Sequence, residues 1–331
     1  MTSVSIVVAI YNRKDELFEL LNSLSHQTDK DFEIIIVDDG SRIDLQPVID
    51  SFDGLLNTHY YKKENSGPGL SRNYGAQRAS GEWLIFLDSD VVTETDYIAN
   101  VKMKILTHPT DAFGGADKAH KGFNLLQKAI SYSMTSVFTT GGIRGRAKSV
   151  SRFQPRSFNM GVKREVFLKV GGFSDLRVGE DPDLSMTLWE QGYKTEFYTL
   201  IDVYHKRRTD IGKFSKQVYR FGVARPLLNR RHPAYTKPTF WFPSVFLIGY
   251  IVGLFHYFVW DNGFVLSMYG LYTLLVFAHA TIINRNMAIG GLSVLTTYVQ
   301  MFSYGFGFLQ SWVKLNILKQ DPREAFPTHF Y

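Results

Sequence analysis

Three acidic clusters in this 331-residue chain have residue types and spacing that could do chemistry. They are DDGS at 38–41, DSD at 88–90 and GED at 179–181. The first two each follow a short, strongly apolar run, and the third precedes a stretch with helical periodicity. Carboxylates placed in this way can bind a metal ion, accept hydrogen bonds from a ligand or take up a proton.

The DSD cluster places Asp88 and Asp90 two residues apart after the run WLIFL. Alternate residues of an extended segment point the same way, so both carboxylates can face one site. Hard oxygen ligands suit Mg²⁺ or Mn²⁺, and such ions also bind substrate phosphates. The alternative interpretation is a chance Asp-x-Asp in a loop, because so short a pattern is weak by itself.

The DDGS cluster follows the apolar run EIIIV. A carboxylate of Asp38 or Asp39 can accept hydrogen bonds from the imide of a uracil ring or from ribose hydroxyls. The alternative is an ordinary capped turn, since Asp-Gly favours turns in any protein.

The GED cluster brings Glu180 and Asp181 just before a predicted amphipathic helix, whose inward residues are Leu184, Leu188 and Trp189. The free amides and positive dipole end of a helix N-terminus would hold an ionised carboxylate in place. An ionised carboxylate beside an acceptor is what general-base catalysis requires. An ordinary acidic first turn is the alternative interpretation.

The elements that must position these clusters alternate between strands and helices. One helix can be capped by Asn12, another lies within 70–80, and strands are predicted at 4–10, 33–37, 57–61 and 83–87. This alternation predicts an α/β domain with a mostly parallel sheet, in which ligands bind at the carboxyl ends of the strands. Both DDGS and DSD lie at such ends. The absence of cysteine excludes disulfides, zinc–thiolate sites and a cysteine nucleophile.

Three stretches in the C-terminal third, 240–260, 263–283 and 286–313, contain no Asp, Glu, Lys or Arg. The first two are long enough, at about 1.5 Å per residue, to cross a hydrocarbon core of ~30 Å. The third is rich in glycine. If all three span and the N-terminal domain is cytosolic, Lys314, Lys319 and Arg323 lie outside, against the positive-inside tendency. We predict two to three transmembrane helices at 239–313 and a tail at 314–331.

Basic residues concentrate just before this region, with ten Lys or Arg between His205 and Lys237 against the single acid Asp210. Together with helical amphipathicity, this charge predicts a segment at 209–238 that lies on anionic membrane lipids. A core-packing helix with a solvated basic face is the alternative. No recognisable nucleic-acid-binding module accompanies the charge, so no nucleic-acid partner is expected. The basic stretch 141–158 is interpreted as a phosphate-gripping or a plain solvated loop.

Four motifs connect these clusters to a known family. They are SIVVAIYNR at 5–13, VDDGS at 37–41, NSGPGLSRNYGAQRASGEWLIFLDSD at 65–90, and GGF followed by GEDPDL within 171–184. In order and spacing they resemble the family 2 glycosyltransferases of the GT-A fold, over about residues 3–208. The resemblance implies a Rossmann-like, mostly parallel sheet flanked by helices in a catalytic domain at 1–208, followed by the α-helical membrane region.

On the donor side, the resemblance implies that Ala9, Tyr11 and Asp39 line a nucleobase and ribose pocket, with Asp38 beside them. Arg72 matches a basic position near the donor phosphates. A nucleotide sugar, with UDP favoured as its nucleotide, is the donor that the resemblance implies.

At the metal, Asp90 matches the more direct ligand and Asp88 the second, and the implied cofactor is Mg²⁺ or Mn²⁺. His205 matches a histidine that some members use near the metal or diphosphate, and a surface histidine is the alternative. Arg207 or Arg208 could steady the departing diphosphate, on the grounds of charge and position only.

On the acceptor side, Asp181 matches the catalytic base and Glu180 its neighbour. The implied reaction is one direct displacement by an acceptor hydroxyl, which inverts the anomeric configuration. We therefore predict a membrane-anchored, metal-dependent, inverting glycosyltransferase that acts on a lipid-linked or surface-polysaccharide glycan. Its catalytic domain is expected on the cytoplasmic side of a bacterial inner membrane.

One departure from the family pattern restricts the predicted reaction, and two other functions are alternatives to it. No tryptophan follows an arginine, so the Gln-x-x-Arg-Trp motif of processive synthases is absent and transfer of a single sugar is expected. A polyprenyl-phosphate sugar transferase is the first alternative, but a phosphate acceptor needs no base such as Asp181. A non-catalytic nucleotide-sugar-binding membrane subunit is the second, and it would be expected to lose an acidic motif.

Overall fold

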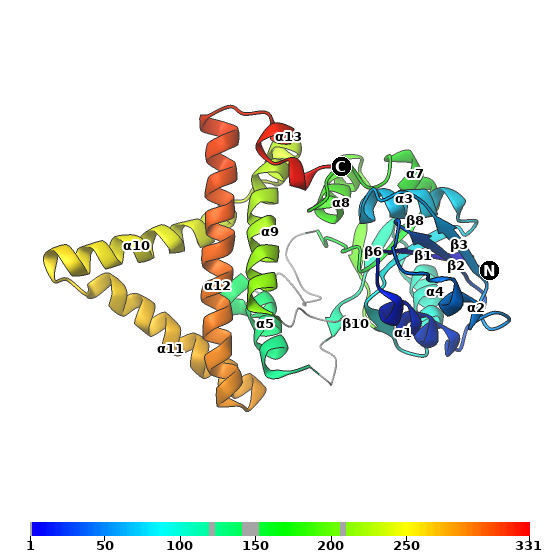
Figure 1. Ribbon diagram of the computed structural model, residues 1–331, viewed down its shortest axis with the longest axis horizontal. Coiled ribbons are helices and arrows are strands. Elements are labelled where there is room, and N and C mark those ends of the chain that lie inside the picture. The colour runs from blue at the N-terminus through cyan, green and yellow to red at the C-terminus, as the bar shows by residue number, and fades with distance from the viewer. Residues whose placement is uncertain (1, 119–122, 141–151, 206–209) are drawn as a thin grey trace. The chain divides into compact units, whose positions relative to one another are not determined.

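The structure is a computed structural model that describes residues 2–118, 123–140, 152–205 and 210–331 (Figure 1). The chain forms two compact units. The first comprises Met1–His120, Ala147–Lys206 and Phe330–Tyr331, and the second comprises Lys121–Arg146 and Arg207–His329. The described residues 123–140 therefore group with the C-terminal helices, although the sequence-based boundaries place them in the catalytic domain.

The first unit is built on a seven-stranded sheet with the order β3-β2-β1-β4-β8-β6-β9. Strands β1 to β4 run parallel, β8 is antiparallel to both β4 and β6, and β9 is parallel to β6. The predicted α/β fold with a mostly parallel sheet is confirmed, and its four predicted strands lie within one residue of their expected bounds. The strands are β1 (Val4–Ile10), β2 (Glu33–Asp38), β3 (Thr58–Lys62), β4 (Trp83–Asp88), β6 (Ala112–Gly114), β8 (Asn159–Lys163) and β9 (Thr195–Phe197).

Helices cover both faces of this sheet (Figure 1). One face carries α1 (Lys14–Ser25), α2 (Gln46–Asp50) and α4 (Tyr97–Thr107), and the other carries α3 (Pro68–Arg78), α7 (Arg164–Lys169) and α8 (Glu180–Glu190). Along β1, Ile6 and Val8 enter the first core and Val7 enters the second, as the period of two in a strand requires. With both faces covered, the strand ends remain as the place where a ligand can reach the sheet.

A second, three-stranded sheet follows the order β5-β10-β7. Its strands are β5 (Val91–Thr93), β10 (Val203–His205) and β7 (Asp117–Lys118). β10 is antiparallel to β5, and the register places His205 opposite Val91. The backbone of His205 thus pairs with the residue that directly follows the DSD cluster.

The predicted N-cap role of Asn12 is wrong. Helix α1 begins at Lys14 and has no side-chain cap. Asn12 instead has a φ of 53° and bonds to the DDGS turn. Its N–H donates to Ser41 Oγ at 2.9 Å, and its Oδ1 accepts from the Arg42 N–H at 2.8 Å. Asn12 therefore ties the end of β1 to the end of β2.

The second unit is helical. Its longer helices are α5 (Leu125–Thr135), α9 (Ile211–Arg231), α10 (Phe242–Trp260), α11 (Phe264–Asn284) and α12 (Met287–Trp312), and its shorter ones are α6 (Val137–Thr140) and α13 (Pro322–Ala325). Gly222 of α9 and Gly307 of α12 face the backbone of the opposite helix, where any Cβ would overlap a carbonyl oxygen. Small residues at these two positions allow the close approach of α9 and α12.

The apolar face of α9 is covered by protein. Phe214 and Val218 lie in a core with Ile130 and Met134 of α5. This packing is what the alternative of a core-packing helix predicts. Contact of the segment 209–238 with membrane lipids stays a prediction.

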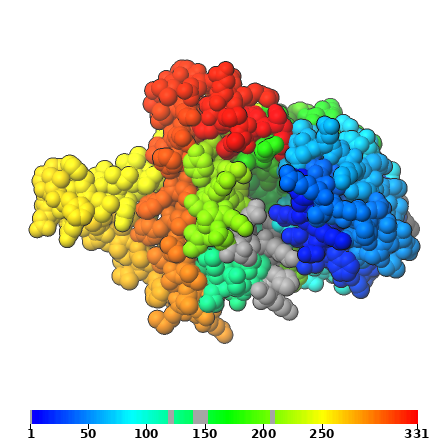
Figure 2. All heavy atoms as spheres, viewed as in Figure 1, coloured from blue at the N-terminus to red at the C-terminus, as the bar shows by residue number. Residues whose placement is uncertain are grey.

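Two segments among the described residues are long and apolar enough to cross a membrane. Pro238–Trp260 has a mean hydropathy of 1.7, and Phe264–Asn284 has 1.6. Figure 2 shows the yellow atoms at the junction of α10 and α11 projecting beyond the rest of the helical unit. Their large side chains are exposed, as Phe258 at 78% and Phe264 at 69% illustrate. In α12, by contrast, residues such as Ile289, Met301 and Phe308 are buried.

Candidate active site

The DDGS and DSD clusters meet at one edge of the large sheet. Strand β1 lies between β2 and β4, and the register pairs Ile10 with Asp38 and Ala9 with Asp88. Both clusters therefore lie at the carboxyl ends of the two parallel strands that flank β1, where ligands bind in open α/β sheets.

The Asp38 carboxylate accepts hydrogen bonds from groups of the protein itself. Its side chain is fully buried, and it accepts hydrogen bonds from the Ser41 N–H at 2.8 Å and from the Tyr60 hydroxyl at 2.8 Å. Burial and the hydrogen bond to Asp38 raise the pKa of Tyr60 well above its usual range, so this hydroxyl stays a donor. Asp38 thus shapes the turn, as the capped-turn alternative predicts.

Asp39 holds the loop that leads into α3. Its carboxylate accepts hydrogen bonds from the backbone N–H groups of Ser66 at 2.8 Å and Gly67 at 2.7 Å. Lys63 Nζ lies 2.5 Å from the same carboxylate, and the Asn65 side chain donates to the Asp39 carbonyl at 2.8 Å. The sequence reasoning missed Lys63, whose only signal is its position just before the ENSGPG loop.

Ala9 lies near the end of β1, and Tyr11 directly follows this strand. Ala9 pairs with Val37 on one side and Asp88 on the other, and Tyr11 leaves 45% of its surface exposed. An exposed aromatic ring at a ligand-binding edge can stack on a planar group. The location therefore suits the nucleobase role that the motif implies.

Arg72 joins the second and third acidic clusters. Its side chain is buried on the first turns of α3, and Nη2 lies 2.6 Å from Asp88 Oδ1. Nη1 of the same guanidinium lies 3.4 Å from Glu180 Oε1. The planar fork of one arginine can hold two carboxylates in a fixed geometry. The site therefore has an acidic pair bridged by a cation and set beneath a helix N-terminus.

Asp90 is paired with Arg13, which the sequence reasoning also missed. Arg13 Nη1 lies 2.5 Å from Asp90 Oδ2, and only 15% of the Asp90 side chain is exposed. Arg13 is the last residue of the motif SIVVAIYNR, so its signal was present, but nothing local indicated its partner. The two carboxylates of the DSD cluster thus each have an arginine partner.

Glu180 and Asp181 occupy the first turn of α8. The helix follows Gly179, whose φ of 93° places it in the left-handed region that favours glycine. Asp181 Oδ2 lies 3.6 Å from Arg156 Nη1, and 17% of its side chain is exposed. Burial and the charge of Asp181 raise the pKa of Glu180 to about 7, although Arg72 acts to lower it. The two adjacent carboxyl groups therefore have different environments.

We expect Glu180→Gln to remove a pH dependence of thermal stability. The pKa of Glu180 is about 7 in the folded state, against an ordinary value of 4.5. Between these two pH values the folded protein therefore keeps a proton on Glu180 that the unfolded chain has lost. Its contribution to stability is thus fully present below the ordinary value and is lost as pH rises through the folded pKa. The wild-type Tm in detergent should fall relative to that of the variant across this range.

The exposed Glu190, at the other end of α8, offers a matched control. Glu190→Gln should leave the wild-type pH dependence of Tm in place. A Tm difference between wild type and Glu180→Gln that stays constant with pH would contradict the assignment.

The remaining predicted residues are placed only in part. His205 ends β10, and no more than its backbone is described. Arg207 and Arg208 lie outside the described residues, as does most of the loop at 141–158. Their assigned roles stay predictions.

The carboxylates of Asp88 and Asp90 suit a metal ion that is coordinated partly by the protein and partly by substrate phosphates. Among the described residues, no three His, Asp or Glu side chains gather closely enough to form a metal cage. Mg²⁺ and Mn²⁺, however, commonly use one or two carboxylates together with substrate phosphates. The donor set therefore suits an ion that arrives with a nucleotide, in exchange for the contacts of Arg13 and Arg72.

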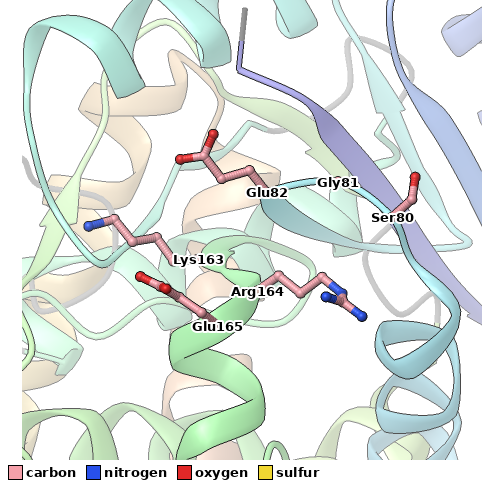
Figure 3. A pocket seen from close by; sticks show the side chains of 6 residues that line it. All are labelled: Ser80, Gly81, Glu82, Lys163, Arg164 and Glu165. Atoms are coloured by element: carbon pink, nitrogen blue, oxygen red, sulfur yellow. The ribbon is translucent and has the colours of Figure 1, made fainter.

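A separate polar hollow lies at the opposite end of β4. Figure 3 shows its lining residues Ser80, Gly81, Glu82, Lys163, Arg164 and Glu165. β4 begins at Trp83 and reaches the acidic site only at Asp88. The hollow is therefore not part of the acidic site.

Comparison with known proteins gives the family context. The model of the family described as "Glycosyl transferase family 2" matches residues 5–171, just over half of the chain. An uncharacterized glycosyltransferase of Haemophilus influenzae is 30% identical over 220 residues, which cover 63% of this chain and 70% of that protein. The poly(ribitol-phosphate) beta-N-acetylglucosaminyltransferase TarS of Staphylococcus aureus is 32% identical over 131 residues, or 38% of this chain and 21% of TarS.

Solved structures with the same fold are also glycosyltransferases. The mannosyltransferase PcManGT from Pyrobaculum calidifontis, in complex with GDP-Man and Mn²⁺, has a TM-score of 0.57 at 18% identity and covers 96% of this chain and 88% of its own. S. aureus TarS 1–349 in complex with UDP has a TM-score of 0.51 at 19% identity, with coverages of 96% and 92%. The similarity confirms the expected fold, a GT-A sheet followed by a helical region.

Proposed function

Because the chain belongs to glycosyl transferase family 2 and is a glycosyltransferase, we propose that it transfers a single sugar from a nucleotide sugar to an acceptor hydroxyl with inversion. The observation that carries this proposal is the bridge from Asp88 through Arg72 to Glu180. It brings the end of β4, which we assign to the donor side, next to the start of α8, which carries the proposed base. A transferase needs these two functions side by side.

The donor side is assigned to the edge formed by β1 and β2. Asp39 binds Lys63 and the loop that opens α3, the exposed Tyr11 follows β1, and the neighbouring arginines can neutralise a diphosphate. UDP is the proposed nucleotide. The UDP-bound TarS structure supports it only through the shared fold, since the mannosyltransferase with that fold binds GDP-Man.

The proposed metal would be held by Asp90 and Asp88. When bound, a divalent cation supplies positive charge against the leaving diphosphate. Arg13 and Arg72 hold these two carboxylates at the strand end and keep the site charge-balanced before a ligand binds. The complex of PcManGT with Mn²⁺ makes the same metal a reasonable first choice.

Asp181 is the proposed general base. It takes the proton of the acceptor hydroxyl while that oxygen forms a bond to the anomeric carbon. The bond from the anomeric carbon to the phosphate oxygen breaks on the opposite face, and the nucleoside diphosphate leaves with its electron pair. Arg156 Nη1 lies 3.6 Å from Asp181 Oδ2 and holds this carboxylate in an ion pair.

The exposed apolar surface of α10 and α11 supports a membrane location. Two segments of sufficient length and hydropathy suit a transmembrane hairpin, and an uncovered face of this kind would be costly in water. We place the catalytic unit on the cytoplasmic side of a bacterial inner membrane. A lipid-linked or surface-polysaccharide glycan is the acceptor class that such a location offers.

The test is release of nucleoside diphosphate from a panel of nucleotide sugars. The protein is purified in detergent and supplied with Mn²⁺ or Mg²⁺ and a membrane-lipid extract as the acceptor source. We expect one donor to be consumed, and chelation or Asp90→Asn to reduce release by about 10²-fold or more through lost charge stabilisation. Asp53→Asn, on the exposed surface after α2, is the matched control and should leave release unchanged.

Two other results of this assay would change the proposed function. Release that survives both chelation and Asp90→Asn would remove the metal from the reaction. Tight donor binding without turnover on any acceptor would favour the non-catalytic binding subunit.

A further inference from the structure

Phe330 and Tyr331 return to the catalytic unit after the helical region and become part of it. Phe330 forms an antiparallel bridge with Leu176, and the Tyr331 N–H donates to the Asp175 carbonyl at 3.1 Å. Phe330 and Leu176 are both buried. These contacts fix the two residues against the segment that leads into Gly179 and the proposed base.

The ring of Tyr331 lies directly on Gly67. Any Cβ at Gly67 would overlap ring atoms of Tyr331, so the contact exists only because that position lacks a side chain. Gly67 is also the residue before the first turn of α3, and its N–H is held by Asp39 at 2.7 Å. Tyr331 therefore touches the loop that Asp39 organises.

The ring also faces the segment that leads into α8. The Arg177 guanidinium carbon lies 5.0 Å from the ring centroid. Burial and the charge of Glu180 raise the pKa of Tyr331 to about 12, so its hydroxyl is protonated at neutral pH. Glu180 in turn packs near Gly69, where a built Cβ would lie 3.6 Å from its Cγ. Tyr331 thus joins the α3 turn to the start of α8.

We propose that Tyr331 is a positioning residue of the acceptor site, whose ring forms the wall on which an acceptor sugar is held beside Asp181. This inference rests on the proposed transferase function. Its support is the place of Tyr331. The Asp175 carbonyl and the neighbouring Phe330–Leu176 bridge hold it on the segment that leads to the base, and its ring faces Arg177. The Tyr331 hydroxyl oxygen is buried, and the part of the ring that stays exposed can contact the C–H groups of a sugar.

The test separates acceptor binding from donor binding. Transfer is measured with the donor found in the panel while the membrane-lipid extract is titrated, which gives an apparent acceptor KM. Donor affinity is measured separately by calorimetry with the nucleoside diphosphate. We expect Tyr331→Ala to raise the apparent acceptor KM about tenfold, equivalent to one lost aromatic contact, with donor affinity within about twofold.

Two further variants test whether the ring itself contacts the acceptor. Tyr331→Phe retains the ring and should restore most of the acceptor affinity, a rescue that points to ring contact with the acceptor. Thr328→Ala, on the exposed part of the same segment, should behave as wild type. Faster transfer by Tyr331→Ala would identify the ring as a plug and overturn the inference, as would an unchanged KM or an equal loss of donor affinity. A wild type that transfers no sugar would instead defeat the proposed function itself.

Discussion

Replacing Asp181 with asparagine is expected to reduce sugar transfer by about 10³-fold, within the range that a general base contributes. The asparagine side chain has nearly the same shape but cannot accept the proton of the attacking hydroxyl. Asp181 forms its ion pair with Arg156, whereas the loop before α3 is held by Asp39. Affinity for the nucleoside diphosphate should therefore remain near that of the wild type.

The measurement is single-turnover transfer together with calorimetric binding of the nucleoside diphosphate. Glu190→Gln, on the exposed last turn of the same helix, is the control for a change of acid to amide on α8. Transfer that survives Asp181→Asn would remove the general base from the mechanism. It would also favour a phosphate acceptor, as in a polyprenyl-phosphate sugar transferase, because a phosphate oxygen is already ionised.

Replacing Arg72 with alanine is expected to damage both stability and activity. The guanidinium is buried between Asp88 and Glu180, and its loss leaves two carboxylates without their shared cation. Breaking a fully buried pair costs about 3–5 kcal/mol. Since 30% of the Asp88 side chain is exposed, solvent screening should bring the cost to roughly 2–3 kcal/mol, which is visible as a lower Tm in detergent.

The same variant should weaken binding of the nucleoside diphosphate by about tenfold or more, since charge-assisted bonds to phosphate are strong. Arg72→Lys keeps the charge but not the planar fork, so its effects should be intermediate. Arg78→Ala, on the exposed end of the same helix, is the control. An Arg72→Ala protein with wild-type Tm and donor affinity would show that the bridge is not part of the working site.

The strands were predictable from the sequence because their signal is local. A buried parallel strand needs a short run of β-branched and apolar residues, and VSIVVAI, EIIIV and WLIFL supply it directly. The acidic clusters follow these runs, so their location at the carboxyl edge of the sheet followed as well. The predicted start of α8 was nearly right: Glu180 and Asp181 were expected just before the helix, and the helix begins at Glu180.

The capping role of Asn12 could not be settled in this way. Its residue type favours a helix cap, but its φ of 53° and its bonds to Ser41 and Arg42 come from a turn on the neighbouring strand. The same limit applies to α9, whose amphipathic pattern is compatible with either lipid or protein on its apolar side. Its contacts with α5 show protein there.

The sequence by itself determined the types and order of the elements, the family, and the three acidic clusters, because each depends on residues that are neighbours along the chain. Only the tertiary structure decided which groups those clusters meet. Arg72 lies 16 residues from Asp88 and 108 from Glu180, Arg13 lies 77 from Asp90, and Tyr331 reaches Gly67 from the far end of the sequence. Such partners are set by the packing of helices on both faces of one sheet, and no local pattern encodes it.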